Sequence, residues 1–372
     1  MEAFKGNAHL SGETRGLYER EVSAETVAAS AGIALDQVTD FSLNMNPFGP
    51  PAASRLAAAD SLSKANAYPP LDPTELRNSI AAWHQVSADS LFFGCGLDEV
   101  IKLLIHAWTN DGERVLIHIP TFPRYALEAD ARGASLRSIE GKDPWSIPLT
   151  EFRQALGTER VALAFVCTPN NPTSATLGAD ELEHLVADFA WTQFVIDEAL
   201  IYPSDAGAVP LVARYPNVAV LRTFSKYFGL AGLRIGYAVA DPARLAKAEF
   251  IRPPFNLSTP GVAAAIAALH EPTFLQESHT AFAVEVENLR CQLKRFAGCR
   301  VHAGNSNMVL LEFTEANSTD VTRELARRGL VVVDGRTFAG LERLDSIRIS
   351  LLARPANDVL LAALADVLER AG

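Results

Sequence analysis

The stretch TFSKYFGLAGLRIGY, residues 223–237, joins two apolar runs and carries its only lysine, Lys226, two residues after the end of the first run. These runs, 218–224 and 234–240, are rich in Val, Leu, Ile and Ala, which is typical of strands in a sheet covered on both faces. Ligands of open α/β sheets bind beyond the carboxyl ends of the strands. We therefore expect the hydroxyl of Ser225 and the amine of Lys226 to lie in a binding site.

Three earlier runs have the same texture: RVLIHIP (114–120), RVALAFVC (160–167) and QFVIDEA (193–199). Segments with helical spacing lie between the runs, and in the segment 97–108 the apolar residues that share one face are Val100, Leu103, Leu104 and Ala107. Strands that alternate with helices predict an α/β fold with a mainly parallel sheet between helices.

The alternation of apolar runs and helical segments changes after about residue 265. A long helical segment, 272–297, leads into the short apolar runs NMVLLEF, LVVVDG and SIRISLL, which predict a smaller α+β domain. The first fifty residues look irregular, and we interpret them as an arm that crosses to the small domain or to a neighbouring subunit. We predict three parts: an N-terminal arm with part of the small domain (1–50), a large ligand-binding domain (51–265) and a C-terminal small domain (266–372).

Composition narrows the class of protein and of ligand. The chain has 372 residues, 48% of them hydrophobic, without a run long enough to span a membrane or an N-terminal apolar core typical of a secretory signal. Its net charge of -11 disfavours nucleic acid as a partner. Four cysteines without a CxxC pair indicate reduced thiols in a cytoplasmic protein. We expect a small-molecule ligand and no metal.

Polar groups stand at the ends of several predicted strands. Gly94 and Gly96 precede the helical segment 97–108, and N–H groups at a helix start bind anions, although a glycine-rich turn alone is weak evidence. Asn171 follows the run 160–167, where it could contact a ligand or simply form part of a turn. Asp197 could cap a loop, but a buried carboxylate is costly unless a cation meets it.

Taken together, these groups match the requirements of pyridoxal phosphate. Such a site needs a lysine that forms an imine with the aldehyde, a carboxylate that meets the protonated ring nitrogen, and a phosphate pocket. Lys226 and Asp197 supply the first two. Thr223, Ser225 and Arg234 would hold the phosphate.

The chain resembles the fold-type I aminotransferases of class I and II, and within them the histidinol-phosphate aminotransferase and threonine-phosphate decarboxylase branch. The motifs that carry the resemblance are DFSLNMNPFGPP, TPNNPT, VIDEA, TFSKYFGLAGLRIGY and SIRISL, which occur in the family's order over nearly the whole chain. The resemblance implies a large domain with a mainly parallel sheet, a smaller α+β domain, and pyridoxal 5'-phosphate as cofactor.

The resemblance also implies roles for residues around the cofactor. Lys226 forms the internal aldimine, Asp197 pairs with the pyridinium nitrogen, Asn171 hydrogen-bonds the ring hydroxyl and Phe122 stacks on the ring. The residues at the cofactor phosphate are Gly96, Leu97, Asp98, Thr223, Ser225 and Arg234. Taken alone, Phe122 is equally consistent with ordinary core packing.

Further roles implied by the resemblance concern the substrate and the assembly. Arg348 binds the substrate α-carboxylate as a bidentate pair. We also assign Asn44 and Arg336 to the substrate site, the latter as a possible substitute for a family arginine. Tyr68 reaches the phosphate of the neighbouring subunit's cofactor, which implies a homodimer. Without the resemblance, Tyr68 could equally be an aromatic residue on the surface, and Arg348 could form an ion pair at a strand edge.

Two departures from the family pattern bear on function. Leu200 stands where aminotransferases commonly have a tyrosine that supports the ring oxygen, which leaves that task to Asn171. Val333 stands where both relatives carry the arginine for the substrate phosphate. The sequence therefore predicts a substrate without a phosphate unless Arg336 takes over that contact.

We conclude from the sequence that the chain is an aminotransferase of amino-acid metabolism and biosynthesis. It would move an amino group between an L-amino acid or related amine and a 2-oxo acid. The alternative is an amino-acid decarboxylase similar to the threonine-phosphate enzyme. A third interpretation, a non-catalytic regulator that binds the cofactor, is disfavoured because such regulators generally add a DNA-binding segment, whereas the match here begins within the first fifty residues.

Overall fold

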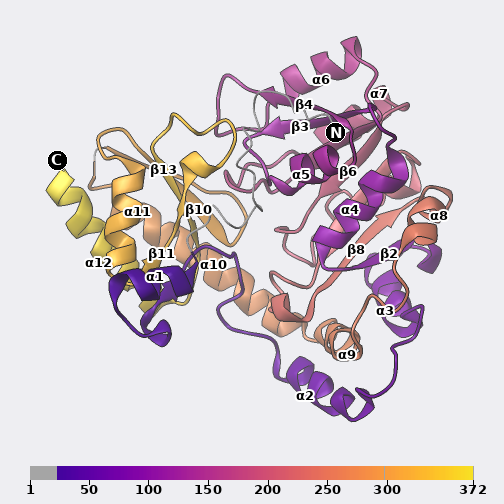
Figure 1. The fold of residues 1–372 in the computed structure, drawn as a ribbon, viewed down its shortest axis with the longest axis horizontal. Coiled ribbons are helices and arrows are strands. Elements are labelled where there is room, and N and C mark those ends of the chain that lie inside the picture. Colours follow the sequence, from indigo (N-terminus) through magenta and orange to yellow (C-terminus); the bar gives the residue numbers. More distant parts are fainter. Residues whose placement is uncertain (1–22, 297, 372) are drawn as a thin grey trace, which may run out of the picture.

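A seven-stranded sheet lies at the centre of the larger part of the molecule (Figure 1). The computed structural model describes residues 23–296 and 298–371, and within them β8 alone runs antiparallel to its neighbours in this sheet. The α/β fold with a mainly parallel sheet is thus confirmed. In spatial order the strands are Leu91–Cys95 (β2), Ile235–Ala240 (β8), Val218–Thr223 (β7), Gln193–Asp197 (β6), Leu163–Cys167 (β5), Arg114–Ile119 (β3) and Ser135–Glu140 (β4).

Helices cover both faces of this sheet. One face packs against α4 (Leu97–Trp108), α5 (Arg124–Ala131) and α8 (Pro242–Ile251); the other packs against α3 (Thr74–His84), α6 (Leu149–Thr158), α7 (Ala179–Asp188) and α9 (Thr259–Ala268). Strand residues alternate between the two cores, since Val115 and Ile117 face α4 whereas Leu116 faces the opposite side. The predicted apolar face of α4 is buried as expected. We call the sheet and these helices the large lobe.

A second sheet of four strands forms the small lobe, at the other end of the molecule (Figure 1). Its strands in spatial order are Val333–Asp334 (β12), Ser346–Ser350 (β13), Met308–Phe313 (β10) and Cys299–His302 (β9), and its helices are α11 (Ser318–Arg327) and α12 (Arg354–Ala371). The long helix α10 (Pro272–Leu293) packs against α12 and β9. No helix among the described residues is both long and apolar enough to cross a membrane.

The N-terminal segment differs in part from the expected irregular arm. Residues 1–22 lie outside the described chain, but α1 (Ala24–Ala31) follows them, and β1 (Thr39–Asp40) pairs in parallel with β11 (Leu330–Val331) of the small lobe. Ser23 accepts a hydrogen bond from the N–H of Thr26 and so caps α1. An eight-residue helix and a two-residue strand are too short for a clear periodic pattern. The three domain bounds inferred from the sequence stay a prediction.

The chain order places the reactive groups at one edge of the large sheet. Because β3, β5, β6 and β7 are mutually parallel, their carboxyl ends meet at the same edge. Strands β3 and β5 are neighbours in the sheet. The chain continues from β3 to β4 on one side of this pair and from β5 to β6 on the other side, so their carboxyl ends form a topological switch point. The small lobe contributes the other wall of the cavity that opens there.

Candidate active site

A cavity of about 550 Å³ lies between the carboxyl edge of the large sheet and the small lobe. It brings together most of the residues predicted from the sequence, which come from segments far apart in the chain. Those that line it are Asn44, Leu97, Asp98, Phe122, Asn171, Asp197, Thr223, Ser225, Lys226, Arg234, Arg336 and Arg348. Gly96 lies behind this lining next to Arg234, and Tyr68 lies outside it.

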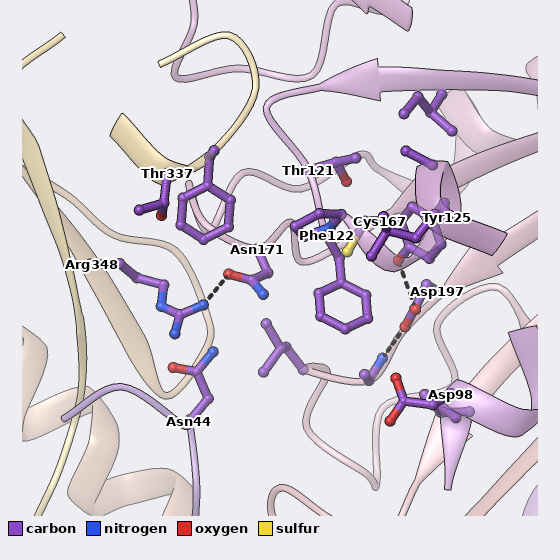
Figure 2. A pocket seen from close by; sticks show the side chains of 18 of the residues that line it. Asn44, Asp98, Thr121, Phe122, Tyr125, Cys167, Asn171, Asp197, Thr337 and Arg348 are labelled. Carbon is purple, nitrogen blue, oxygen red and sulfur yellow. Dashed lines mark hydrogen bonds between the residues drawn. The ribbon is translucent and has the colours of Figure 1, made fainter. Parts of the chain in front are cut away.

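Asp197 ends β6 and is only 2% exposed. Figure 2 shows its carboxylate held from two sides: one oxygen accepts a hydrogen bond from the Tyr125 hydroxyl at 2.7 Å, and the other accepts from the N–H of Ala199 at 2.9 Å. Burial raises the pKa of Asp197 above its ordinary value, while the two hydrogen bonds and the charge of Lys226 act in the opposite direction. A cation placed against this carboxylate would therefore be strongly favoured.

Tyr125 is a site residue that the sequence analysis did not identify. It is fully buried near the start of α5, where it stacks on Phe165 at 4.5 Å between ring centroids. Burial raises the pKa of its hydroxyl well above the ordinary value, so the group stays protonated and donates to Asp197. The available signal was the aromatic pair Phe122 and Tyr125 where α5 begins, whose rings lie in T-shaped contact at 5.7 Å between centroids.

Lys226 lies in the turn after β7. Its amine donates a hydrogen bond to the backbone oxygen of Leu43 at 2.8 Å, so the segment before α2 (Ala52–Ser61) reaches across to the reactive end of the large sheet. Asn46 reinforces this contact, because its side-chain amide donates to the backbone oxygen of Tyr227 at 2.7 Å. The N-terminal segment and the lysine turn are thus fixed relative to each other.

The start of α4 and Arg234 lie together at one end of the cavity. Gly96 precedes the helix with φ of 77°, and a Cβ at this position would lie 2.2 Å from the Arg234 guanidinium. Arg234 donates to Asp98 at 3.2 Å, and Thr223 and Ser225 line the same end of the cavity. The first N–H groups of a helix lack intrahelical partners and attract anions. This end of the cavity has the donors that a phosphate group requires.

Arg348 lies on the opposite wall, in β13 of the small lobe, and is 4% exposed. Figure 2 shows it pointing across the cavity toward Asn171, whose side-chain oxygen accepts its hydrogen bond at 2.8 Å. The backbone oxygen of Ser42 accepts a second hydrogen bond. Its guanidinium carbon also lies 5.6 Å from the centroid of the Phe338 ring. These contacts hold the guanidinium in one plane at the cavity wall.

The remaining predicted residues are also placed by the structure. Asn44 lines the cavity, but its side-chain oxygen accepts from the Ser350 hydroxyl at 2.7 Å within the small lobe. Arg336 lines the cavity and forms an ion pair with Asp345 at 2.7 Å. Tyr68 is 82% exposed and stacks on Phe255 at 4.7 Å. Their roles toward ligands stay predictions.

The arrangement fits the cofactor that the sequence resemblance implies. It offers a buried carboxylate for a protonated ring nitrogen and an amine at a strand end for an aldehyde. The glycine before α4 leaves room for Arg234 where a Cβ would collide, which suits a phosphate close to the backbone. Phe122 lines the cavity in T-shaped contact with Tyr125 and is available to cover one ring face. The donor set therefore suits pyridoxal phosphate.

Comparison with known proteins agrees with this geometry. The family model described as aminotransferase class I and II matches residues 36–365. The histidinol-phosphate aminotransferase of Halalkalibacterium halodurans is 35% identical over 90% of this chain and 90% of its own length, and that of Bacillus subtilis is 32% identical over 94% and 97%. The histidinol-phosphate aminotransferase of Sinorhizobium meliloti, solved in complex with pyridoxal-5'-phosphate, superposes with a TM-score of 0.82 at 26% identity, covering 98% of this chain and 100% of the other.

A substitution at Gly96 tests the anion site directly. We expect Gly96→Ala to weaken binding of pyridoxal phosphate to the apo-protein at least tenfold, on the order of 1.4 kcal/mol, because the new methyl group displaces Arg234 and the positive φ is strained. The measurement is a titration followed by cofactor absorbance and protein fluorescence. Gly157→Ala is the control, because this glycine lies in α6 with open space around it. An unchanged affinity in Gly96→Ala would contradict the assignment.

Proposed function

We propose that this chain, which belongs to the class I and II aminotransferases, takes its amino group from an unphosphorylated L-amino acid with a largely apolar side chain. The chain is a pyridoxal-phosphate-dependent aminotransferase, and the decarboxylase alternative has less support. The identity of the substrate is the new element in this proposal, since the curated relatives named above are histidinol-phosphate aminotransferases.

The observation that carries the proposal is the set of cations at the cavity. Among the described residues that line it, these are Lys226, Arg234, Arg336 and Arg348. Lys226 is needed for the reaction, Arg234 lies at the cofactor phosphate site, and Arg348 suits an α-carboxylate. Arg336 is already paired with Asp345. A substrate phosphate would thus have to break an existing ion pair to gain a cationic partner.

Val333 supports the same conclusion. It faces Arg348 across the β12–β13 pair, so both side chains lie on the same face of the small sheet. The Val333 side chain is 2% exposed and packs with Leu310, Phe338 and Leu341. A valine here supplies packing but no donor. Other apolar groups at the cavity, such as Leu43, Met45 and Ile119, suit an apolar substrate side chain.

The residues of the site divide the work of transamination. Pyridoxal phosphate supplies, when bound, an aldehyde that takes up amino groups and a ring that stores electrons. Asp197 favours a proton on the ring nitrogen because its buried carboxylate is the opposite charge. Arg348 orients the substrate carboxylate, and Lys226 Nζ takes and returns the proton of the substrate Cα. Asn171 lies beside Arg348, at the place implied for the ring hydroxyl.

The covalent role of Lys226 has a direct test. Purified protein should be yellow, and borohydride reduction should fix the cofactor to the peptide that contains Lys226, because this amine follows β7 and lines the cavity. Peptide mass mapping after reduction makes the measurement. Lys226→Ala should lose the covalent label, whereas Lys247→Ala, a change in α8 outside the cavity lining, should retain it. A label on another lysine would show that Lys226 was wrongly assigned.

We also propose that the enzyme is a homodimer that shares Tyr68 between sites. Tyr68 and Phe255 stack on each other while both remain exposed, and Leu71 and Phe250 are further exposed apolar side chains, with Phe250 90% exposed. Tyr68 itself is absent from the lining of the cavity in its own chain. Exposed aromatic side chains of this kind are suited to a contact with another protein chain.

Sedimentation velocity combined with activity tests the dimer. We expect a dimer at micromolar concentration, with an interface above the ~1,600 Å² of a standard complex. Tyr68→Phe should weaken cofactor binding by ~1 kcal/mol, the value of one hydrogen bond, without dissociating the dimer. Tyr215→Phe serves as the control, because the Tyr215 hydroxyl is occupied by Glu183 away from the cavity. An active monomer at the working concentration would overturn the proposal.

Substrate choice is tested by steady-state kinetics with histidinol phosphate, threonine phosphate and a series of unphosphorylated apolar amino acids. We expect the apolar amino acids to have the highest kcat/KM, and Arg336→Ala to change that value by less than about threefold, since a few tenths of a kcal/mol is typical of a surface ion pair. Arg343→Ala, a change at an exposed neighbour outside the cavity lining, is the control.

One result would reverse this view of the substrate. If a phosphorylated substrate had the highest kcat/KM, and Arg336→Ala lowered it about tenfold or more, consistent with ~1.4 kcal/mol of lost transition-state binding, Arg336 would be the phosphate residue. The interpretation of Val333 would then be wrong.

A further inference from the structure

A small apolar cluster of the small lobe stands apart from the two large cores. It consists of Leu310, Val333, Phe338 and Leu341, each at most 3% exposed, and we call it the wall cluster. These residues come from β10, β12 and the segment between β12 and β13. Trp145 and Leu344 pack against the wall cluster from outside.

Trp145 belongs to the other lobe. It lies in the segment between β4 and α6 of the large lobe, where its backbone N–H donates to the Asp143 side chain at 3.2 Å. Its ring stacks on His302 of β9, with 4.4 Å between ring centroids and 23° between the planes. His302 is held in turn by Glu312 at 2.8 Å. Trp145 therefore ties the large lobe to the small sheet through two contacts, one with the wall cluster and one with His302.

The wall cluster reaches the active site through Phe338. This ring lines the cavity and lies under the Arg348 guanidinium, 5.6 Å from its carbon. The neighbours of Phe338 in the chain, Thr337 and Ala339, line the cavity too, and Figure 2 shows Thr337 on the same wall as Arg348. A shift of Phe338 would therefore move both the apolar wall and the support of the carboxylate-binding arginine.

We propose that Trp145 is a specificity-determining positioning residue, which holds Phe338 against Arg348 and so fixes the apolar wall that faces the substrate side chain. The proposal rests on the function proposed above, an unphosphorylated amino acid with an apolar side chain. Protein interiors are close-packed, so a large ring fixes the positions of the side chains around it. If the ring is removed, neighbouring side chains shift to fill part of the void. Trp145 lies outside the cavity lining, so it acts only through Phe338 and its neighbours.

The test compares Trp145→Ala and Trp145→Phe with Trp191→Ala. Trp191 is 60% exposed and stacks edge-on against Phe189, away from the cavity lining. For each variant, kcat and KM are measured with the best apolar amino acid and with alanine, and the affinity for pyridoxal phosphate is measured by titration. The decisive quantity is the ratio of kcat/KM for the two amino acids, since a general loss of folded protein lowers both equally.

We expect Trp145→Ala to lower that ratio at least tenfold, mainly through a higher KM for the apolar amino acid, with cofactor affinity within threefold of the wild type. Trp145→Phe and Trp191→Ala should keep the ratio within threefold. An unchanged ratio in Trp145→Ala, or an equal loss for both amino acids, would overturn the proposal.

Failure of the proposed function gives a different pattern. In that case the wild type itself would prefer a phosphorylated substrate, whatever the Trp145 variants do. The ratio is then taken between that substrate and alanine. A tenfold fall in Trp145→Ala would support the positioning role, and a constant ratio would overturn it.

Discussion

The buried carboxylate of Asp197 is the constraint on which the site depends. Because the side chain is only 2% exposed, ionising it is unfavourable. The hydrogen bonds from Tyr125 and Ala199 pair its oxygens but do not neutralise its charge. The fold can place positive charge near this carboxylate, because parallel strands bring Lys226 and the candidate cofactor site to the same edge of the sheet. A cationic ring nitrogen, which we propose lies at this place, would compensate the carboxylate and would itself be kept protonated.

The two lobes meet at the cavity. Arg348 of the small lobe donates to Asn171 of the large lobe, and the N-terminal segment inserts between them through Leu43. On the small-lobe side, Val333 and Phe338 pack in an apolar cluster and offer no charged contact to a ligand. The candidate catalytic groups thus lie at the sheet edge of the large lobe, and we propose that the substrate side chain is selected by the small-lobe residues that face them across the cavity.

Sequence reasoning succeeded where the signal is local. Runs of apolar residues that end in Asp197 or Ser225, and the motif around Lys226, identified the sheet, its edge and the cofactor. It failed for contacts that depend on tertiary packing. Tyr125 donates to Asp197 across 72 positions of the chain, and Trp145 reaches His302 from another lobe. The strands β2, β4 and β9, which lie at the edges of their sheets, were also missed: Gly94 interrupts the short apolar run of β2, and β4 and β9 are polar and only partly buried.

The most direct measurement of the central claim is a single half-reaction. Holoenzyme is mixed with one amino acid without an acceptor, and conversion of the cofactor is followed by absorbance in the wild type, Asp197→Asn and Asp197→Glu. Because asparagine keeps the shape but not the charge, the account predicts a rate at least ~100-fold lower in Asp197→Asn, the effect of one lost electrostatic contact to a reacting group, and partial recovery in Asp197→Glu. A rate in Asp197→Asn within about threefold of the wild type would contradict the account.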